Sequence, residues 1–385
     1  MFLCFVGLAG CQPAPALSSP TATGAATSRD DGDSDDPALV YDAASRRAAE
    51  GDRAGALALL ERLDARGWSF CPRERDMPGL VELPQYRDLC ARMQARAPRV
   101  QRAAVVMTLP ERGLRPEGIA YDDATQAMFV GSVARRKIVR VAADGSIRDF
   151  ATRADGLDAV LGLRVDRPRG LLWALSDAYR SMEGFDARDA GRAALVGFDL
   201  DSGAVRERLL PPAGSHLLND VVIGPDGTAY VTDSETGAVW SGRSGERTLV
   251  ALVPAGTLRY PNGIACDGTR LFVAHLSGVA VVPLAGGIPK ELVVPGGMML
   301  GGFDGLYAMG DMLLGVQNTF GSPRVLRVDL DAAHAAALRV AVLESAHPAL
   351  ATPMTAALVI GERRLRVVVR GDQDATTILS VPIDD

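Results

Sequence analysis

Four residues with side-chain oxygens, Glu117, Asn219, Asn262 and Asp304, stand at the same point of a sequence repeat, each opening a short apolar run. Carboxylate and amide oxygens without histidine or cysteine suit a hard cation, and calcium takes about six to eight oxygen ligands. If the four side chains meet, they form a ligand set for one divalent cation. We predict calcium, with zinc, manganese or magnesium as the other ions that such an oxygen site accepts.

The repeat indicates how residues so far apart in the chain can meet. Its units begin at six positions, which we call slot residues and which are separated by 44, 58, 43, 42 and 50 residues: Glu117, Leu161, Asn219, Asn262, Asp304 and Met354. This is the period of a four-stranded propeller blade, about 40 to 50 residues. Equivalent positions of the blades surround one axis, so the slot residues are expected to converge. The alternative is that the polar ones are turn residues, because Asp-Gly and Asn-Gly pairs are common hairpin signals.

From about residue 100 onward, short β-branched or aromatic runs alternate with Asp-Gly, Pro-Asp-Gly and Gly-Gly turns. The sequence therefore predicts an all-β, six-bladed β-propeller over residues 100–385. The run 103–109 precedes the first slot residue, and we expect it to complete the last blade and close the ring. The long second step contains an insertion at 180–192, which is either a lid over the site or an ordinary solvent loop.

Residues 37–96 have a different pattern, because their apolar residues recur at helical spacing in two segments that Gly51-Asp52 separates. We predict a small α-helical region built on a hairpin. Together with residues 80–93 it resembles tetratricopeptide-type repeats, so it could bind a protein partner. The alternative is a plain packing module without a peptide ligand.

The N-terminus has the pattern of a processing signal. Residues 1–10 are almost wholly apolar and end in Leu8-Ala9-Gly10 before Cys11, which resembles a bacterial lipobox. We expect residues 1–11 to be a lipoprotein signal with lipidated Cys11, and residues 12–36 to be a disordered tether. Gln12 at the next position predicts an exported protein anchored to the outer membrane and facing the periplasm. The alternative is a hydrophobic leader of another kind.

Export would place the chain in an oxidising compartment, where Cys71 and Cys90 are expected to form a disulfide in the helical region. Otherwise both are buried thiols. A net charge of −6 and the lack of a Lys/Arg-rich block predict no nucleic-acid partner. Beyond the N-terminus no apolar stretch approaches the roughly 20 residues that span a bilayer, so the lipid is the only membrane contact expected.

The repeat also resembles a known family through four of its motifs. The segments Arg115-Pro-Glu-Gly, Leu218-Asn-Asp with Pro225-Asp-Gly, Tyr260-Pro-Asn-Gly-Ile and Phe303-Asp-Gly-Leu are similar to those of the gluconolactonase, regucalcin and senescence-marker-protein family. The likeness covers residues 100–385. It implies that Glu117, Asn262 and Asp304 bind a catalytic divalent ion, and that Asn219 lies at the ion and the substrate.

Paraoxonases and strictosidine-synthase-like propellers are similar as well, and the comparison with paraoxonases implies that Asp220 could bind a second, structural calcium. One departure limits the resemblance. Regucalcin has an arginine just before its Asn-Asp pair, whereas this chain has Leu217 and then Leu218. A specificity for sugar lactones is therefore not carried over.

The expected function is metal-dependent hydrolysis of a lactone or related ester, in which the ion polarises the carbonyl and a carboxylate activates water. Asp304 is the first choice for the base and Asp220 the second. His216, three residues before Asn219, is expected near the channel mouth as a base or substrate-binding group, or else as a hydrogen-bonding loop residue. No Gly-x-Ser-x-Gly elbow is present. The rival is a non-catalytic ligand-binding propeller or envelope scaffold lipoprotein with a structural calcium.

Overall fold

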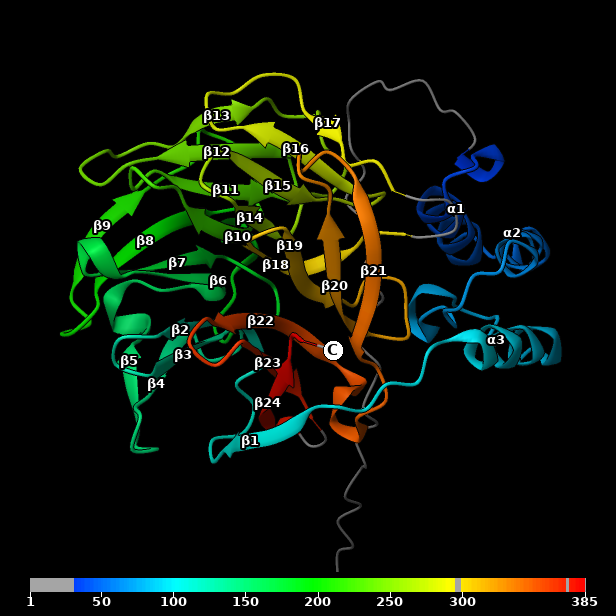
Figure 1. The fold of residues 1–385 in the computed structure, drawn as a ribbon, viewed down its shortest axis with the longest axis horizontal. Helices are drawn as coiled ribbons and strands as arrows, with labels where there is room; N and C mark the ends of the chain where they lie inside the picture. The colour runs from blue at the N-terminus through cyan, green and yellow to red at the C-terminus, as the bar shows by residue number, and fades with distance from the viewer. Residues whose placement is uncertain (1–30, 295–298, 372–373, 385) are drawn as a thin grey trace, which may run out of the picture.

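Six four-stranded antiparallel sheets form the body of the molecule (Figure 1). The computed structural model describes residues 31–294, 299–371 and 374–384, apart from the side chains of 31, 351 and 353. Cys11, with the rest of the expected signal and most of the expected tether, lies outside the described residues. The first strands of the sheets contact one another in a closed ring, β2 to β6, β10, β14, β18 and β22. These sheets are the blades of a propeller, and the first strands surround its axis.

The blades follow the chain in order from the axis outwards. The first three consist of β2 (Pro116–Asp122), β3 (Ala127–Ser132), β4 (Lys137–Val141) and β5 (Ile147–Ala151); of β6 (Ala159–Asp166), β7 (Leu171–Asp177), β8 (Ala193–Asp199) and β9 (Val205–Leu209); and of β10 (Leu218–Ile223), β11 (Ala229–Asp233), β12 (Ala238–Gly242) and β13 (Val250–Val253). The other three consist of β14 (Ile264–Cys266), β15 (Arg270–Ala274), β16 (Val279–Pro283) and β17 (Lys290–Glu291); of β18 (Phe303–Met309), β19 (Met312–Gln317), β20 (Arg324–Leu330) and β21 (Ala337–Glu344); and of β22 (Pro353–Val359), β23 (Arg364–Arg370), β24 (Thr376–Pro382) and β1 (Ala104–Leu109).

Burial falls from the second strand of a blade to its last strand. Every residue of β3, β7 and β11 is buried, whereas β5, β9 and β13 begin with exposed residues. The second strands lie between two neighbouring blades, so both of their faces pack against apolar side chains. The core is therefore spread over the interfaces between blades.

The sixth blade closes the ring with the strand that precedes all the others. β1 pairs with β24 in antiparallel register, from Ala104 opposite Ser380 to Leu109 opposite Thr376. This confirms the closure predicted for residues 103–109. The fully buried carboxylate of Glu344 supports it, because its two oxygens accept hydrogen bonds from the backbone amides of Arg102, Ala103, Ala346 and His347 at 2.7 to 2.8 Å.

In the part of the chain that the structure describes, three α-helices precede the propeller: α1 (Pro37–Ala49), α2 (Arg53–Ala65) and α3 (Pro84–Arg96). Asp36 and Asp52 cap the first two helices by accepting hydrogen bonds from the amides of Ala38 and Gly55, both at 2.9 Å. Cys71 and Cys90 form a disulfide between the α2–α3 connection and α3. Single-turn 3-10 helices lie at Asp31–Asp33, Glu74–Asp76, Arg153–Asp155, Arg167–Arg169, Ala187–Asp189 and Pro348–Ala351.

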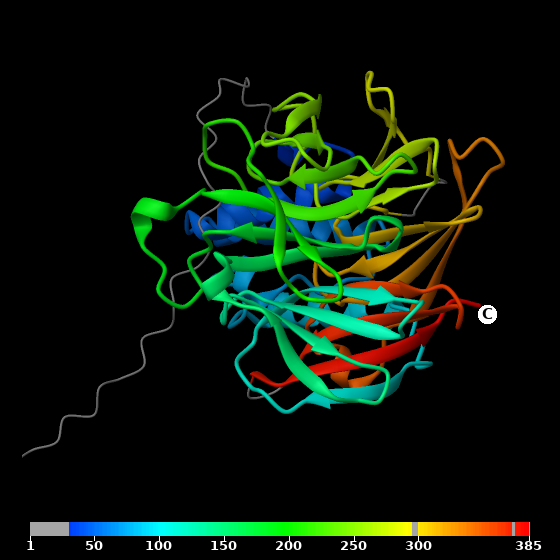
Figure 2. The same ribbon diagram turned by 90° about the vertical axis from the view of Figure 1, so that its left-hand side faces the viewer.

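The helices lie together on one face of the propeller, to its right in Figure 1 and behind the strands in Figure 2. Their apolar core continues into propeller loops, because Phe320 packs edge-on against the rings of Tyr41 and Trp68. Leu276 and Met299 join the same cluster. The helical region is thus docked on the β15–β16, β17–β18 and β19–β20 connections. The expected fold class, a six-bladed propeller after a small helical region, is confirmed.

Among the described residues, none of the helices is both long and apolar enough to pass through a bilayer.

Candidate metal centre

The first strands of the blades are irregular at their slot residues. Register shifts interrupt β2 between Pro116 and Ile119, and interrupt β6, β10, β18 and β22 at the equivalent places. β14 differs, because it begins only at Ile264, two residues after Asn262. A β-bulge bends a strand locally and redirects a side chain. The repeated bulge therefore explains how one position in each blade turns towards the channel.

Glycine follows four of the six slot residues, and close approach of neighbouring blades requires it. A Cβ atom on Gly118 would lie 1.9 Å from the carbonyl oxygen of Leu161, and one on Gly162 would lie 2.7 Å from that of Asn219. Gly305 has a φ of 78°, and its Cβ would lie 1.9 Å from Thr355 Oγ1. The motif of a slot residue followed by glycine thus brings the blades together at the axis.

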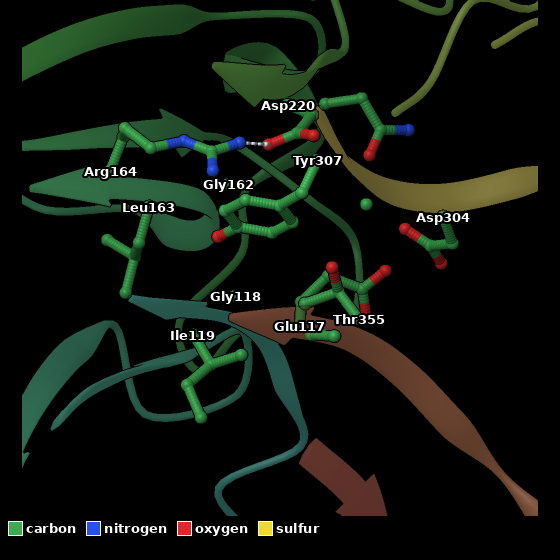
Figure 3. Close-up of a pocket in the computed structure, with 13 residues that line it drawn as sticks. Glu117, Gly118, Ile119, Gly162, Leu163, Arg164, Asp220, Asp304, Tyr307 and Thr355 are labelled. Atoms are coloured by element: carbon green, nitrogen blue, oxygen red, sulfur yellow. Dashed lines mark ion pairs between the residues drawn. The ribbon is translucent and has the colours of Figure 1, made fainter. Parts of the chain in front are cut away.

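A polar cavity lies between these strands, and its lining includes Glu117, Asn219 and Asp304. Figure 3 shows the carboxylates of Glu117 and Asp304 turned towards the same space from β2 and β18. The amide nitrogen of Asn219 donates to Ser234 Oγ at 2.9 Å, so its oxygen is the end that can serve as a ligand. Three of the four predicted ligands therefore meet at the axis.

Asn262, the fourth predicted ligand, contacts the same carboxylate from β14's entry loop. Its side chain hydrogen-bonds to Asp304, and its Oδ1 is buried with no hydrogen-bond partner among the described residues. Leaving a buried amide oxygen unpaired costs about 1 to 3 kcal/mol. A cation would satisfy that oxygen, so the residues present fit a divalent ion. In the described ranges no cluster of three or more His, Cys, Asp and Glu side chains is placed to hold an ion, and the proposed set instead joins two carboxylates to two amides.

The two carboxyl groups have strongly perturbed affinities for protons. Burial and then the charge of Asp304 raise the pKa of Glu117 well above its usual range, against a smaller lowering by Arg75 and Arg370. Burial raises the pKa of Asp304 to about 7, although a hydrogen bond from Asn318 opposes this. Two ionised carboxylates facing each other in a buried site repel. A divalent cation between them would remove that repulsion.

Asn318 is a further residue of the site that sequence reasoning missed. It lies just after β19, and its amide nitrogen donates to Asp304 Oδ2 at 2.9 Å and to the carbonyl oxygen of Met354 at 3.1 Å. It therefore orients Asp304 and links it to the sixth blade. The available signal was a polar pair, Gln317-Asn318, at the end of an otherwise apolar strand.

Asp220 also lines the cavity, but hydrogen bonds occupy its carboxylate. Its Oδ1 accepts from the amide of Val221 at 2.8 Å and its Oδ2 from the amide of Ile264 at 3.0 Å. Arg164 lies 3.8 Å from Oδ1 and stacks over the ring of Tyr307 at 4.1 Å (Figure 3). Asp220 thus ties neighbouring blades together, which leaves Asp304 the better placed base. Arg164 was also missed, although it is the one charged residue inside the apolar part of β6.

The structure does not bring His216 to the cavity. Its Nδ1 lies 2.7 Å from Asp233 Oδ2, its Nε2 lies 2.8 Å from the carbonyl oxygen of Pro212, and its ring packs edge-on against Trp240. Both ring nitrogens are therefore engaged, Nδ1 by β11 of the third blade and Nε2 by the β9–β10 connection. This arrangement does not support the substrate-binding role expected for His216, and favours a hydrogen-bonding loop residue.

Ion pairs anchor the inserted loop between β7 and β8. Arg192 pairs with Asp158 at 2.9 Å, and Glu183 pairs with Arg135. Burial, followed by the charge of Glu117, raises the pKa of Tyr179 at the start of this loop. The charge of Glu117 therefore acts on Tyr179, and we expect Tyr179 to border the channel mouth.

The raised pKa values predict that cation binding depends on pH. A cation binds the ionised carboxylates and so displaces the protons that Glu117 and Asp304 hold. Because the pKa of Asp304 is about 7 in the cation-free protein, calcium affinity should rise about tenfold per pH unit below this value for each proton released. Isothermal titration in two buffers of different ionisation enthalpy measures both the affinity and the protons released. Affinity that stays constant between pH 5 and pH 8 would contradict the assignment.

The raised pKa of Asp304 also determines how the stability of the cation-free protein changes with pH. Between the ordinary carboxyl pKa of 3.8 and about 7, Asp304 is protonated when folded and ionised when unfolded. The folded state then binds more protons, so the cation-free protein should lose stability as pH rises through this window. Thermal unfolding of the wild type and of Asp304→Asn checks this, because the variant should show a smaller loss.

Comparison with known proteins supports the fold. The sequence matches no protein-family model and no curated protein. Among solved structures, a gluconolactonase from Xanthomonas campestris is similar with a TM-score of 0.51 at 16% identity, over 74% of this chain and 98% of its own. A calcium-binding protein, regucalcin, from Agrobacterium tumefaciens has a TM-score of 0.50 at 17% identity, over 74% and 97%.

A third similar structure is the PQQ-bound aldose sugar dehydrogenase of Streptomyces coelicolor, with a TM-score of 0.51 at 18% identity over 74% of this chain and 100% of its own. The structural neighbours thus include the gluconolactonase and regucalcin propellers that the sequence motifs resemble. At these identities the comparisons establish the propeller fold.

Proposed function

We propose that the protein hydrolyses a lactone or related ester with the help of one divalent cation, calcium, at the propeller axis. Glu117, Asn262 and Asp304 would hold the ion, with Asn219 beside it. The observation that carries the proposal is the convergence of the carboxylates of Glu117 and Asp304 on one polar cavity. The side chain of Asn262, whose buried amide oxygen has no partner among the described residues, hydrogen-bonds to Asp304 beside it. The gluconolactonase among the structural neighbours supports the reaction class.

A cation bound at this site would supply a Lewis acid that polarises the substrate's carbonyl oxygen. Asp304 would accept a proton from the attacking water, whose oxygen bonds to the acyl carbon. It would then return the proton to the leaving oxygen as the acyl C–O bond breaks. A bound cation would keep this carboxylate ionised and therefore able to accept a proton. Asn318 holds this carboxylate in place at 2.9 Å.

Export of the protein is a separate part of the proposal. The disulfide between Cys71 and Cys90 suits an oxidising compartment, which supports an exported, lipid-anchored protein.

A panel of lactones and esters, assayed with calcium, after chelation and after calcium is restored, tests the reaction. We expect turnover that disappears on chelation and returns with the ion. Turnover that is unaffected by chelation would overturn the metal-dependent mechanism. Tight calcium binding without turnover of any member of the panel would instead indicate a binding propeller with a structural ion.

A further inference from the structure

Two large side chains cross the channel beyond the slot residues. The third residue after each slot residue is alanine or valine in four blades, and the six are Ala120, Arg164, Val222, Ala265, Tyr307 and Ala357. Of these six, Arg164 and Tyr307 line the polar cavity. The guanidinium of Arg164 lies over the ring of Tyr307 at 4.1 Å (Figure 3). Because β6 and β18 belong to the second and fifth blades, on opposite sides of the ring of six, the stacked pair spans the channel.

The guanidinium of Arg164 is buried and held in one place. Solvent reaches 12% of its side chain. Its Nε donates to the carbonyl oxygen of Val221 at 2.8 Å, and its Nη2 lies 3.8 Å from Asp220 Oδ1. A guanidinium keeps its charge in proteins, and its planar face stacks on aromatic rings. Arg164 therefore places a fixed positive charge inside the channel.

The charge that faces Arg164 is the carboxylate of Asp220, which is 8% exposed. The amide of Leu306 donates to this carboxylate in addition to the amides of Val221 and Ile264. Donors from the third, fourth and fifth blades thus surround its two oxygens. A buried charge also needs an opposite charge nearby, and Arg164 supplies one from the second blade.

The resemblance to paraoxonases implies a second, structural calcium at Asp220, and the residues present do not fit that ion. The residues directly after the slot residues are Gly118, Gly162, Asp220, Gly263, Gly305 and Thr355. Four of the six are glycines, so this level of the channel offers one carboxylate and one hydroxyl, whereas calcium takes about six to eight oxygens. Arg164 already engages the carbonyl oxygen of Val221. An ion bound to Asp220 Oδ1 would also lie close to the guanidinium, which would repel it.

We propose that the guanidinium of Arg164 serves as the inner cation of the channel, in the place where the resemblance puts a second calcium. The protein then binds one divalent ion in the channel, at the slot residues, and its blades are joined beyond that ion without a metal. This role of Arg164 does not depend on the hydrolytic function.

The number of calcium ions bound by the full-length protein tests the proposal. Equilibrium dialysis at saturating calcium should find the same number of ions per chain for the wild type and for Asp220→Asn, because Asp220 holds Arg164 and not a metal. Loss of an ion in Asp220→Asn would overturn the proposal.

A double-mutant cycle in chelator tests whether Arg164 is the charge partner of Asp220. Arg164→Met keeps a long side chain over Tyr307 and removes the charge, which leaves Asp220 buried without its cation. Asp220→Asn leaves Arg164 without its anion, so each variant should lower the unfolding midpoint by about 5 °C or more. The double variant should lose clearly less than the sum of the two losses. Additive losses would overturn the proposal.

Arg206→Met is the matched control, because Arg206 also lies in the second blade and pairs with Asp199, but 55% of its side chain is exposed. An exposed ion pair contributes little to stability, so this variant should unfold within about 2 °C of the wild type. Equal midpoints for Arg164→Met and Arg206→Met would overturn the proposal.

The two measurements fail independently of each other and of the proposed function. A wild type that binds no calcium contradicts the metal-dependent hydrolase, whereas the cycle, which is measured without calcium, still decides the role of Arg164. If Arg164→Met does not fold, the calcium count of the wild type and of Asp220→Asn decides it.

Discussion

Asp304→Asn is expected to lower both calcium affinity and lactone turnover by at least about 10³-fold. The substitution keeps the size of the side chain and removes one of the two negative charges that face the ion. It also removes the group that accepts the proton of the attacking water. Calorimetric titration with calcium and steady-state turnover at saturating calcium measure the two losses.

The fold itself should survive this substitution, which makes the result interpretable. At pH 6 and below, the carboxyl group of Asp304 in the cation-free protein is mostly protonated, since its pKa is about 7. A neutral amide is therefore a close mimic of that state. In chelator the variant should unfold at the wild-type temperature or slightly above it. Retained calcium-dependent turnover in a folded Asp304→Asn protein would remove Asp304 from the mechanism.

Gly118→Ala is expected to destabilise the propeller by about 3 to 5 kcal/mol, at the upper end of single-residue effects. The added Cβ would lie 1.9 Å from the carbonyl oxygen of Leu161 and 3.2 Å from the side chain of Leu163. The first contact is with backbone of the next blade, so it can relax only if the bulges at Glu117 and Leu161 shift. Thermal or denaturant unfolding measures the loss.

A second glycine provides the control for this prediction. Gly361 lies in the β22–β23 turn, and the nearest atom to a Cβ placed there is Asp123 Oδ1 at 3.9 Å. Gly361→Ala should therefore change stability by about 0.5 kcal/mol or less. If the two variants unfold at the same temperature, the close approach of the blades does not require glycine at position 118, and the prediction is wrong.

The sequence predicts well those features of the molecule that recur in every blade. Each slot residue opens a unit of similar length, and an equivalent place in every blade has an equivalent place around the axis. This is why Glu117, Asn219 and Asp304, which are far apart in the chain, could be predicted to meet. The closing strand was predictable from the same pattern, because the run 103–109 precedes the first slot residue and so lies outside the six units.

The sequence does not predict the orientation of single side chains or their hydrogen-bond partners. His216 is three residues from Asn219, yet its loop directs the ring to Asp233 within the blade. Asp220 follows Asn219 directly, and a bulge places both at the cavity, where amides from two blades occupy the carboxylate. Nothing local to these residues indicates which partner each of them finds.

The docking of the helical region illustrates the greater difficulty of contacts between regions. The segment that follows α2 has no repeat and no motif, and its position follows from the docking of Phe320 against Tyr41 and Trp68. That contact joins residues more than two hundred positions apart.

A crystal structure of the protein grown with calcium tests the central claim most directly. The account predicts one ion on the propeller axis, with oxygens of Glu117, Asn262 and Asp304 at about 2.3 to 2.6 Å and the Asn262 oxygen no longer unpartnered. An axis without an ion at saturating calcium, or an ion held by other residues, would contradict it.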